Sequence, residues 1–114
     1  MKSEDLLSEL KAYIKRYVDS CVPGYLSSLD KFALQESGKP FLDLLFTSPS
    51  KAYKILLTYY KNTYTADFAM TTLFLKPIAV KLKELGLEDK LLQLIKEGRD
   101  SEFLNILTKK LRTS

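Results

Sequence analysis

The chain has 114 residues, of which 46% are hydrophobic and 28% charged, and its formal net charge is +4. This length and balance are those of one globular domain and lie far from the composition of disordered chains. There is no histidine and a single cysteine, Cys21. The commonest general base and zinc ligand is therefore missing, and neither an internal disulfide nor a cysteine-rich metal site can form. We expect a protein that is not an enzyme and that holds no metal or cofactor.

The sequence shows no signal for export or for a membrane. Its first residues, Met-Lys-Ser-Glu-Asp, turn acidic at once and lack the apolar stretch of a signal peptide. The longest weakly polar run, 68–75, is far below the ~18 residues of a membrane span. We expect a cytoplasmic protein that does not bind a membrane. The scarcity of Asn, Gln and Cys beside abundant Lys is typical of thermophile proteins.

The first predicted helix covers residues 3–21. Apolar side chains recur in it at spacings of three and four, and these form one face: Leu7, Leu10, Ile14, Tyr17 and Cys21. Ser3 is a suitable N-cap, and Pro23-Gly24 ends the helix. Because Cys21 falls on the apolar face, we expect its thiol to be buried and inert.

Three more helices are predicted before residue 63. Residues 25–37 repeat the apolar pattern, and the glycine that follows suits the left-handed position after a helix. Residues 41–46 are apolar almost all round, so this short helix should be buried. Ser48 followed by Pro49 is a typical N-cap and first helical residue, and the pair begins a helix over 49–62.

The fifth predicted helix covers residues 65–85 and ends before Gly86. Its first half, 68–75, carries no charge on any side, so we expect it to be the central helix of the core. Pro77 lies inside the helical pattern. A proline there removes one backbone hydrogen bond and clashes with the carbonyl of Leu73, which predicts a kink near residues 73–76.

Two short helices complete the chain, over 87–97 and 100–111, and Gly98 lies in the tight turn between them. No stretch alternates as a strand does, and no hairpin signal occurs. The sequence therefore predicts a single all-α domain over residues 1–114. We expect a compact bundle of six or seven helices with its central helix kinked at Pro77.

The aromatic content favours a protein-interaction role. Seven tyrosines and six phenylalanines are many for a small bundle to cover, and tyrosine is enriched at protein interfaces. We expect a homodimer or a stable protein complex, with a regulatory or scaffolding role and with the helix over 3–21 at the interface. The apolar stripe of that helix is also wide enough for a helix packed inside a bundle.

A basic helix face raises the alternative of nucleic-acid binding. Residues 51–83 contain six lysines against one acidic residue, and four side chains share one face: Lys51, Lys54, Thr58 and Lys61. Such a stripe suits a phosphate backbone, although an ordinary solvated helix face has the same pattern. If the last two helices form a helix-turn-helix, its outer side adds Lys109, Lys110 and Arg112.

A second alternative is a small-ligand pocket beside the predicted kink. Tyrosines cluster near two threonines in this part of the chain, and we expect the pocket to be lined by Tyr53, Tyr60, Tyr64, Thr71 and Thr72. Hydroxyl groups and carbonyls freed at a proline kink are typical polar anchors in an apolar cavity. An ordinary aromatic core whose hydroxyls reach the surface would show the same residues.

Overall fold

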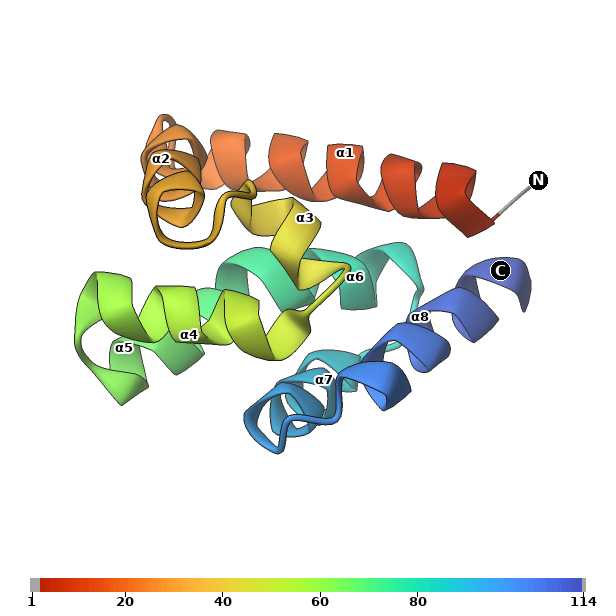
Figure 1. Ribbon diagram of the computed structural model, residues 1–114. Helices are drawn as coiled ribbons and strands as arrows, with labels where there is room; N and C mark the ends of the chain where they lie inside the picture. Colours follow the sequence, from red (N-terminus) through yellow and green to blue (C-terminus); the bar gives the residue numbers. More distant parts are fainter. Residues whose placement is uncertain (1–2, 114) are drawn as a thin grey trace.

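Apolar side chains spaced three and four residues apart fold into helices along residues 3–113 (Figure 1). The computed structural model describes the backbone of residues 3–113 and the side chains from residue 5 to residue 113. The elements in chain order are α1 (Ser3–Cys21), α2 (Tyr25–Ser37), α3 (Phe41–Leu45), α4 (Pro49–Tyr60), α5 (Thr63–Ala69), the π-helix η1 (Met70–Leu75), α6 (Lys76–Lys81), α7 (Leu87–Lys96) and α8 (Asp100–Thr113). No strand occurs between residues 3 and 113, and the predicted all-α class is confirmed.

The elements α5, η1 and α6 follow one another without a break and form one rod over residues 63–81. Counted this way, residues 3–113 form seven helical rods, which is within the predicted six or seven. The radius of gyration is 13.1 Å, close to the value of about 13 Å for a compact chain of this length.

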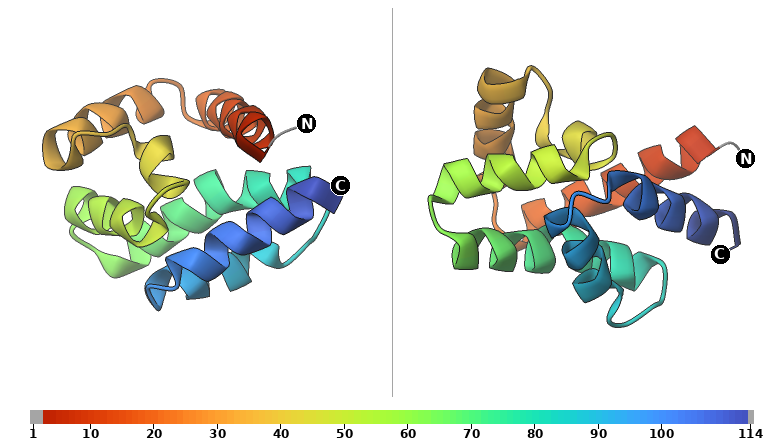
Figure 2. Two further views of the ribbon diagram at one scale, coloured as in Figure 1. Left: turned by 45° about the vertical axis from the view of Figure 1, so that its right-hand side comes forward. Right: turned by 60° about the horizontal axis from the view of Figure 1, so that its bottom comes forward.

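The rod of α5, η1 and α6 lies at the centre of the bundle. Helix α1 covers one side of it, and α4 and α7 pack on others (Figures 1 and 2). Helix α2 packs against both α1 and α4, and α8 packs against α1 and α7. The first turn of α1 and the last turn of α8 lie at the same end of the molecule (Figure 2).

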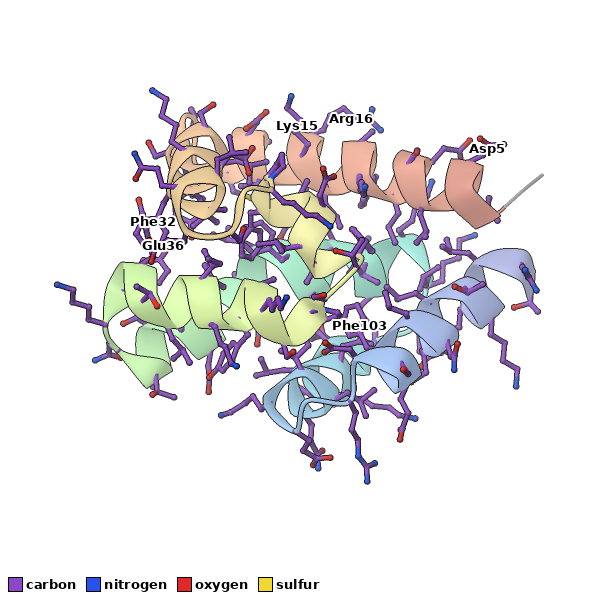
Figure 3. All side chains as sticks on the ribbon, in the orientation of Figure 1. Asp5, Lys15, Arg16, Phe32, Glu36 and Phe103 are labelled. Atoms are coloured by element: carbon purple, nitrogen blue, oxygen red, sulfur yellow. The ribbon has the colours of Figure 1, made fainter. Side chains whose placement is uncertain are left out.

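Aromatic rings from distant segments fill the core. The rings of Phe41 and Phe74 are 4.5 Å apart between centroids, and both side chains are fully buried. Phe103 of α8, labelled in Figure 3, is also fully buried. Helix α3 is buried along almost its whole length, as its sequence predicts.

The predicted end of α2 is confirmed in its details. Gly38 has a φ of 81°, and its N–H donates to the carbonyl of Leu34. A residue with a Cβ is strained in this left-handed conformation, so glycine ends the helix at low cost.

Two predictions of burial and several predicted helix bounds are wrong. The thiol of Cys21 is exposed, because the buried line of α1 runs through Leu10, Ile14 and Val18 and the helix ends at Cys21, before that line repeats. Phe68, expected in the core, is exposed. The fifth predicted helix ends at Lys81 instead of residue 85, so the last residues of that range form a turn.

The bend expected at Pro77 stays a prediction, but the backbone before it departs from the α-helix. In η1 the backbone hydrogen bonds follow the π-helical pattern, in which an N–H donates to the carbonyl five residues back instead of four. The Lys76 N–H, for example, donates to the carbonyl of Thr71. Pro77 offers no N–H for an α-helical bond, and a π-helical turn is one way in which a helix adapts to such a break.

Within residues 3–113, no helix is both long and apolar enough to cross a lipid bilayer.

Candidate interaction surface

Two recesses lie side by side along the π-helix. The smaller, of about 330 Å³, is lined by Tyr64, Asp67, Phe68, Thr71 and Thr72. The larger, of about 510 Å³, is lined by Tyr17, Thr71, Thr72, Lys76, Leu85, Gly86, Glu88 and Asp89. Thr71 and Thr72 line both, so the two recesses adjoin, and we call them together the η1 groove. π-Helical segments are often found at functional sites.

Exposed apolar side chains stand at both ends of the η1 groove. Tyr64 is 81% exposed and Phe68 is 62% exposed, and their spacing of four residues places both on one face of α5. Leu85, in the turn between α6 and α7, is 86% exposed. The other exposed large apolar side chains in the described residues are each less than half exposed. Aromatic and leucine side chains that are this exposed to solvent and lie near one another are typical of a binding surface.

A buried carboxylate lies in the larger recess. The side chain of Glu88, in the first turn of α7, is 9% exposed, and its Oε2 lies 3.4 Å from the Lys76 Nζ. Burial alone would raise the pKa of Glu88. The amide groups of Glu88 and Gly86 at the helix N-terminus, together with Lys76, outweigh burial and hold the pKa below its ordinary value. The groove therefore contains a fixed negative charge paired with a half-exposed lysine.

The other end of the groove is tied to α4 and α7 by Asp67. This carboxylate accepts a hydrogen bond from the Tyr53 hydroxyl and pairs with the Lys96 ammonium at 2.7 Å. Burial, and then the adjacent carboxylate, raise the pKa of Tyr53. Tyr53 is thus a neutral donor that positions Asp67.

The five residues of the predicted ligand pocket are divided between several places. Tyr64, Thr71 and Thr72 line the groove. Tyr53 is buried and bonded to Asp67, and the Tyr60 hydroxyl bonds to that of Tyr25. Burial and the Tyr60 hydroxyl raise the pKa of Tyr25.

The predicted basic face lies on α4 and on the lysine that follows it. Lys51, Lys54, Thr58 and Lys61 are all exposed, and within residues 3–113 none of the three lysines forms an ion pair with a carboxylate. A shallow recess of about 290 Å³ beside two of them is lined by Glu36, Ser37, Lys51, Lys54 and Ile55.

The cations of the last helix do not join that face. Lys109 and Arg112 are exposed, and Lys110 pairs with Glu84. They lie in the second half of α8, which points to one end of the molecule, while α4 runs toward the opposite end, where it ends at Tyr60 (Figure 1).

Helix α1 presents a charged outer face. Lys15 and Arg16 point away from the other helices in Figure 3, and Leu10, Ile14 and Val18 are fully buried. Of the apolar stripe that suggested an interface on this helix, the bundle covers Leu10 and Ile14 completely and Leu7 and Tyr17 in part.

Sequence reasoning missed Phe68 and Leu85 as surface residues. Phe68 lies in an uncharged run that resembles a core helix, and Leu85 falls within the predicted helix. One signal in the sequence indicated that Leu85 is exposed. In the order Lys-Glu-Leu-Gly over residues 83–86, this leucine follows two charged residues and precedes a glycine, which is typical of a turn.

The fold and the groove define a small all-α bundle with an aromatic groove along a π-helical rod. Among residues 3–113, no three Cys, Asp or Glu side chains come together in an arrangement that could hold a metal ion. Comparison with known proteins found no family model, no curated protein and no solved structure that matches this chain.

Proposed function

We propose that this chain is a non-catalytic interaction domain that forms a homodimer through the η1 groove. The observation that supports this is the exposure of Tyr64, Phe68 and Leu85 around one groove. Covering apolar side chains with a second copy removes their area from water, which is the main driving force of association. A regulatory or scaffolding role in the cell fits such a domain.

The groove is suited to pairing with itself. Phe68 and Leu85 lie on opposite sides of Thr71 and Thr72. A two-fold axis perpendicular to the rod reverses its direction in the partner. In the proposed dimer the end of one groove that carries Phe68 covers the end of the other that carries Leu85, so that apolar side chains cover one another.

Sedimentation of Phe68→Glu tests the dimer. The unmodified chain should sediment at micromolar concentration with twice the protomer mass of 13.1 kDa, and Phe68→Glu should sediment at 13.1 kDa. A carboxylate at an apolar contact costs more than 1.4 kcal/mol, so the dissociation constant should rise more than about tenfold. Leu34→Glu, on α2, changes an exposed leucine elsewhere and should leave the dimer intact. A mass of 13.1 kDa for the unmodified chain overturns the proposal.

The unpaired lysines of α4 favour nucleic-acid binding as the second candidate function. If the lysines at 51, 54 and 61 neutralise phosphates, binding should weaken with salt with a log–log slope of about three. Replacing all three by glutamine should abolish binding and leave the melting temperature nearly unchanged. A matched control replaces three exposed lysines elsewhere, at 15, 31 and 90, and should bind as the unmodified chain does. Equal loss in both triple variants would show only a net-charge effect and would remove this candidate.

A further inference from the structure

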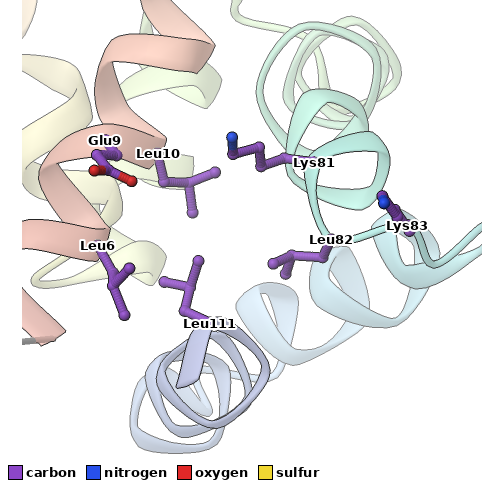
Figure 4. A pocket seen from close by; sticks show the side chains of 7 residues that line it. All are labelled: Leu6, Glu9, Leu10, Lys81, Leu82, Lys83 and Leu111. Atoms are coloured by element: carbon purple, nitrogen blue, oxygen red, sulfur yellow. The ribbon is translucent and has the colours of Figure 1, made fainter. Parts of the chain in front are cut away.

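A separate cleft lies where α1, the end of α6 and the second half of α8 meet (Figure 4). Its volume is about 500 Å³, within the range of small-molecule sites. The lining side chains are Leu6, Glu9, Leu10, Lys81, Leu82, Lys83 and Leu111. None of them belongs to the η1 groove or to the basic face of α4.

The interior of the cleft is aliphatic. Leucines 6, 10, 82 and 111 come from three parts of the fold and point toward a common centre in Figure 4. Leu10 is fully buried and Leu111 is nearly so, while Leu6 and Leu82 are half-buried. Their side chains carry no hydrogen-bonding group, so the interior is suited to a hydrocarbon chain.

The mouth of the cleft is charged, with two cations against one anion. The Lys81 side chain extends across the cleft toward α1, where its Nζ lies 5.5 Å from the centroid of the Tyr13 ring (Figure 4). This cation–π contact holds the ammonium beside the mouth. Lys83 and Glu9 lie on the rim. Among the described residues that line the cleft, the charges of the mouth sum to +1, beside an aliphatic interior.

Lys83 has a φ of 56°, the left-handed conformation of a residue that ends a helix, and this conformation fixes where its side chain leaves the backbone at the edge of the cleft.

We propose that this cleft binds a single-chain anionic amphiphile, a medium-chain carboxylate in its simplest form. The alkyl chain lies among the four leucines, and the carboxylate accepts hydrogen bonds from the Lys81 ammonium in the field of Lys83. This site is independent of the proposed dimer, because its lining residues lie outside the η1 groove.

Titration with matched probes tests the cleft. Decanoate should shift the methyl NMR signals of leucines 6, 10, 82 and 111, and decyltrimethylammonium, with the same chain and the opposite charge, should bind about tenfold more weakly. Equal binding of the two probes overturns the proposal. So does a decanoate response centred on Tyr64 and Phe68.

Two variants separate the head group from the chain. Lys81→Met keeps the aliphatic stem and should weaken decanoate binding about tenfold, while Lys90→Met, at an exposed lysine of α7, should not. Leu6→Trp should fill the interior and block both probes. Circular dichroism confirms that each variant is folded, and sedimentation shows whether dimer formation is unchanged. Unchanged decanoate binding by Lys81→Met contradicts the proposal.

Vesicles distinguish a free amphiphile from a membrane lipid. Vesicles of anionic phospholipid present a charged head group but keep their acyl chains in the bilayer, so they should leave the four leucine signals unchanged. Binding to vesicles without binding to decanoate would overturn the proposal of a free amphiphile.

Discussion

Lys83 occupies a backbone position that favours glycine. At the end of α6 the N–H of Lys83 donates to the carbonyl of Val80, and the N–H of Glu84 donates to the carbonyl of Ala79. These two bonds make a Schellman motif, whose left-handed residue is usually glycine. Here a lysine with a φ of 56° takes that place, so its side chain adds strain to the end of the helix.

Lys83→Gly should therefore stabilise the fold. Relief of the left-handed strain is expected to raise the free energy of unfolding by roughly 1 kcal/mol and the melting temperature by about 4 °C. Lys83→Ala keeps a Cβ in the same conformation and should give no such gain. Thermal denaturation of both variants checks this, and equal melting temperatures would show that the conformation contributes nothing.

Glu88 should make stability depend on pH. Its pKa in the fold is below the ordinary value of 4.5, so the unfolded chain binds a proton more readily than the folded one. The contribution of Glu88 is therefore complete above the unfolded pKa and is lost as the pH falls through the folded pKa.

Glu88→Gln tests this at the same residue. At pH 7 the variant should be less stable by about 1 kcal/mol, the usual value for a carboxylate at a helix N-terminus. The difference should vanish in acid, where the glutamate is protonated. Urea unfolding at several pH values measures it, and a constant difference across that range would contradict the assignment.

Among the elements, α8 supplies the cap of α4. The Asp100 carboxylate accepts hydrogen bonds from the Ser50 N–H at 2.9 Å and from the Ser50 hydroxyl at 2.8 Å. Ser48, the N-cap expected from the sequence, makes no capping bond through its side chain. The N-terminus of α4 is therefore satisfied by a residue fifty positions away.

The two alanine substitutions should differ accordingly. Asp100→Ala should destabilise the fold by about 1–2 kcal/mol, because it leaves the first turn of α4 without its acceptor. Ser48→Ala should stay within about 0.5 kcal/mol of the unmodified chain. Chemical denaturation of both variants measures the two losses in free energy of unfolding. A larger loss for Ser48→Ala than for Asp100→Ala would show that Ser48 is the cap, as the sequence predicts.

Helix ends are predicted correctly from the sequence where a residue with a strong local preference marks them, and are missed where none does or where that residue is not recognised. Helices α1 and α2 end where Pro23-Gly24 and Gly38 stop them, and both bounds agree with the prediction. The end of α6 was missed because Lys83 adopts the conformation of a glycine. The start of α5 was placed two residues late because Asn62, whose side chain accepts from the Thr65 N–H, was not recognised as its cap.

The candidate groove was beyond sequence reasoning for a different reason. A helical wheel assumes a constant number of residues per turn. The π-helical hydrogen bonds of η1 change that number between Phe68 and Pro77, so the wheel misplaces side chains there. Thr71 and Thr72 were expected beside a pocket, and both line the groove. Its remaining walls come from α5, α6 and the turn that follows, and from α1 and α7, whose packing on the rod no local pattern encodes.

At the scale of the whole molecule, the number of tyrosines and phenylalanines is a weaker argument for a partner than the sequence analysis supposed. Most rings are covered within the bundle, where Phe32 packs on Tyr59 with centroids 5.2 Å apart and Tyr59 packs on Tyr60 at 5.1 Å. The case for a dimer therefore rests on Tyr64, Phe68 and Leu85 rather than on composition.

Thermal unfolding tests the single domain and the dimer together. One cluster of buried side chains joins all the helical rods, so the chain should unfold in one transition in which near- and far-ultraviolet circular dichroism coincide. If folding and self-association are coupled, a tenfold rise in protein concentration stabilises the dimer by about 1.4 kcal/mol and raises its melting temperature. In Phe68→Glu, which leaves the core intact, the melting temperature should not depend on concentration. Two separate transitions would contradict the single domain, and a melting temperature of the unmodified chain that does not change with concentration would contradict the dimer.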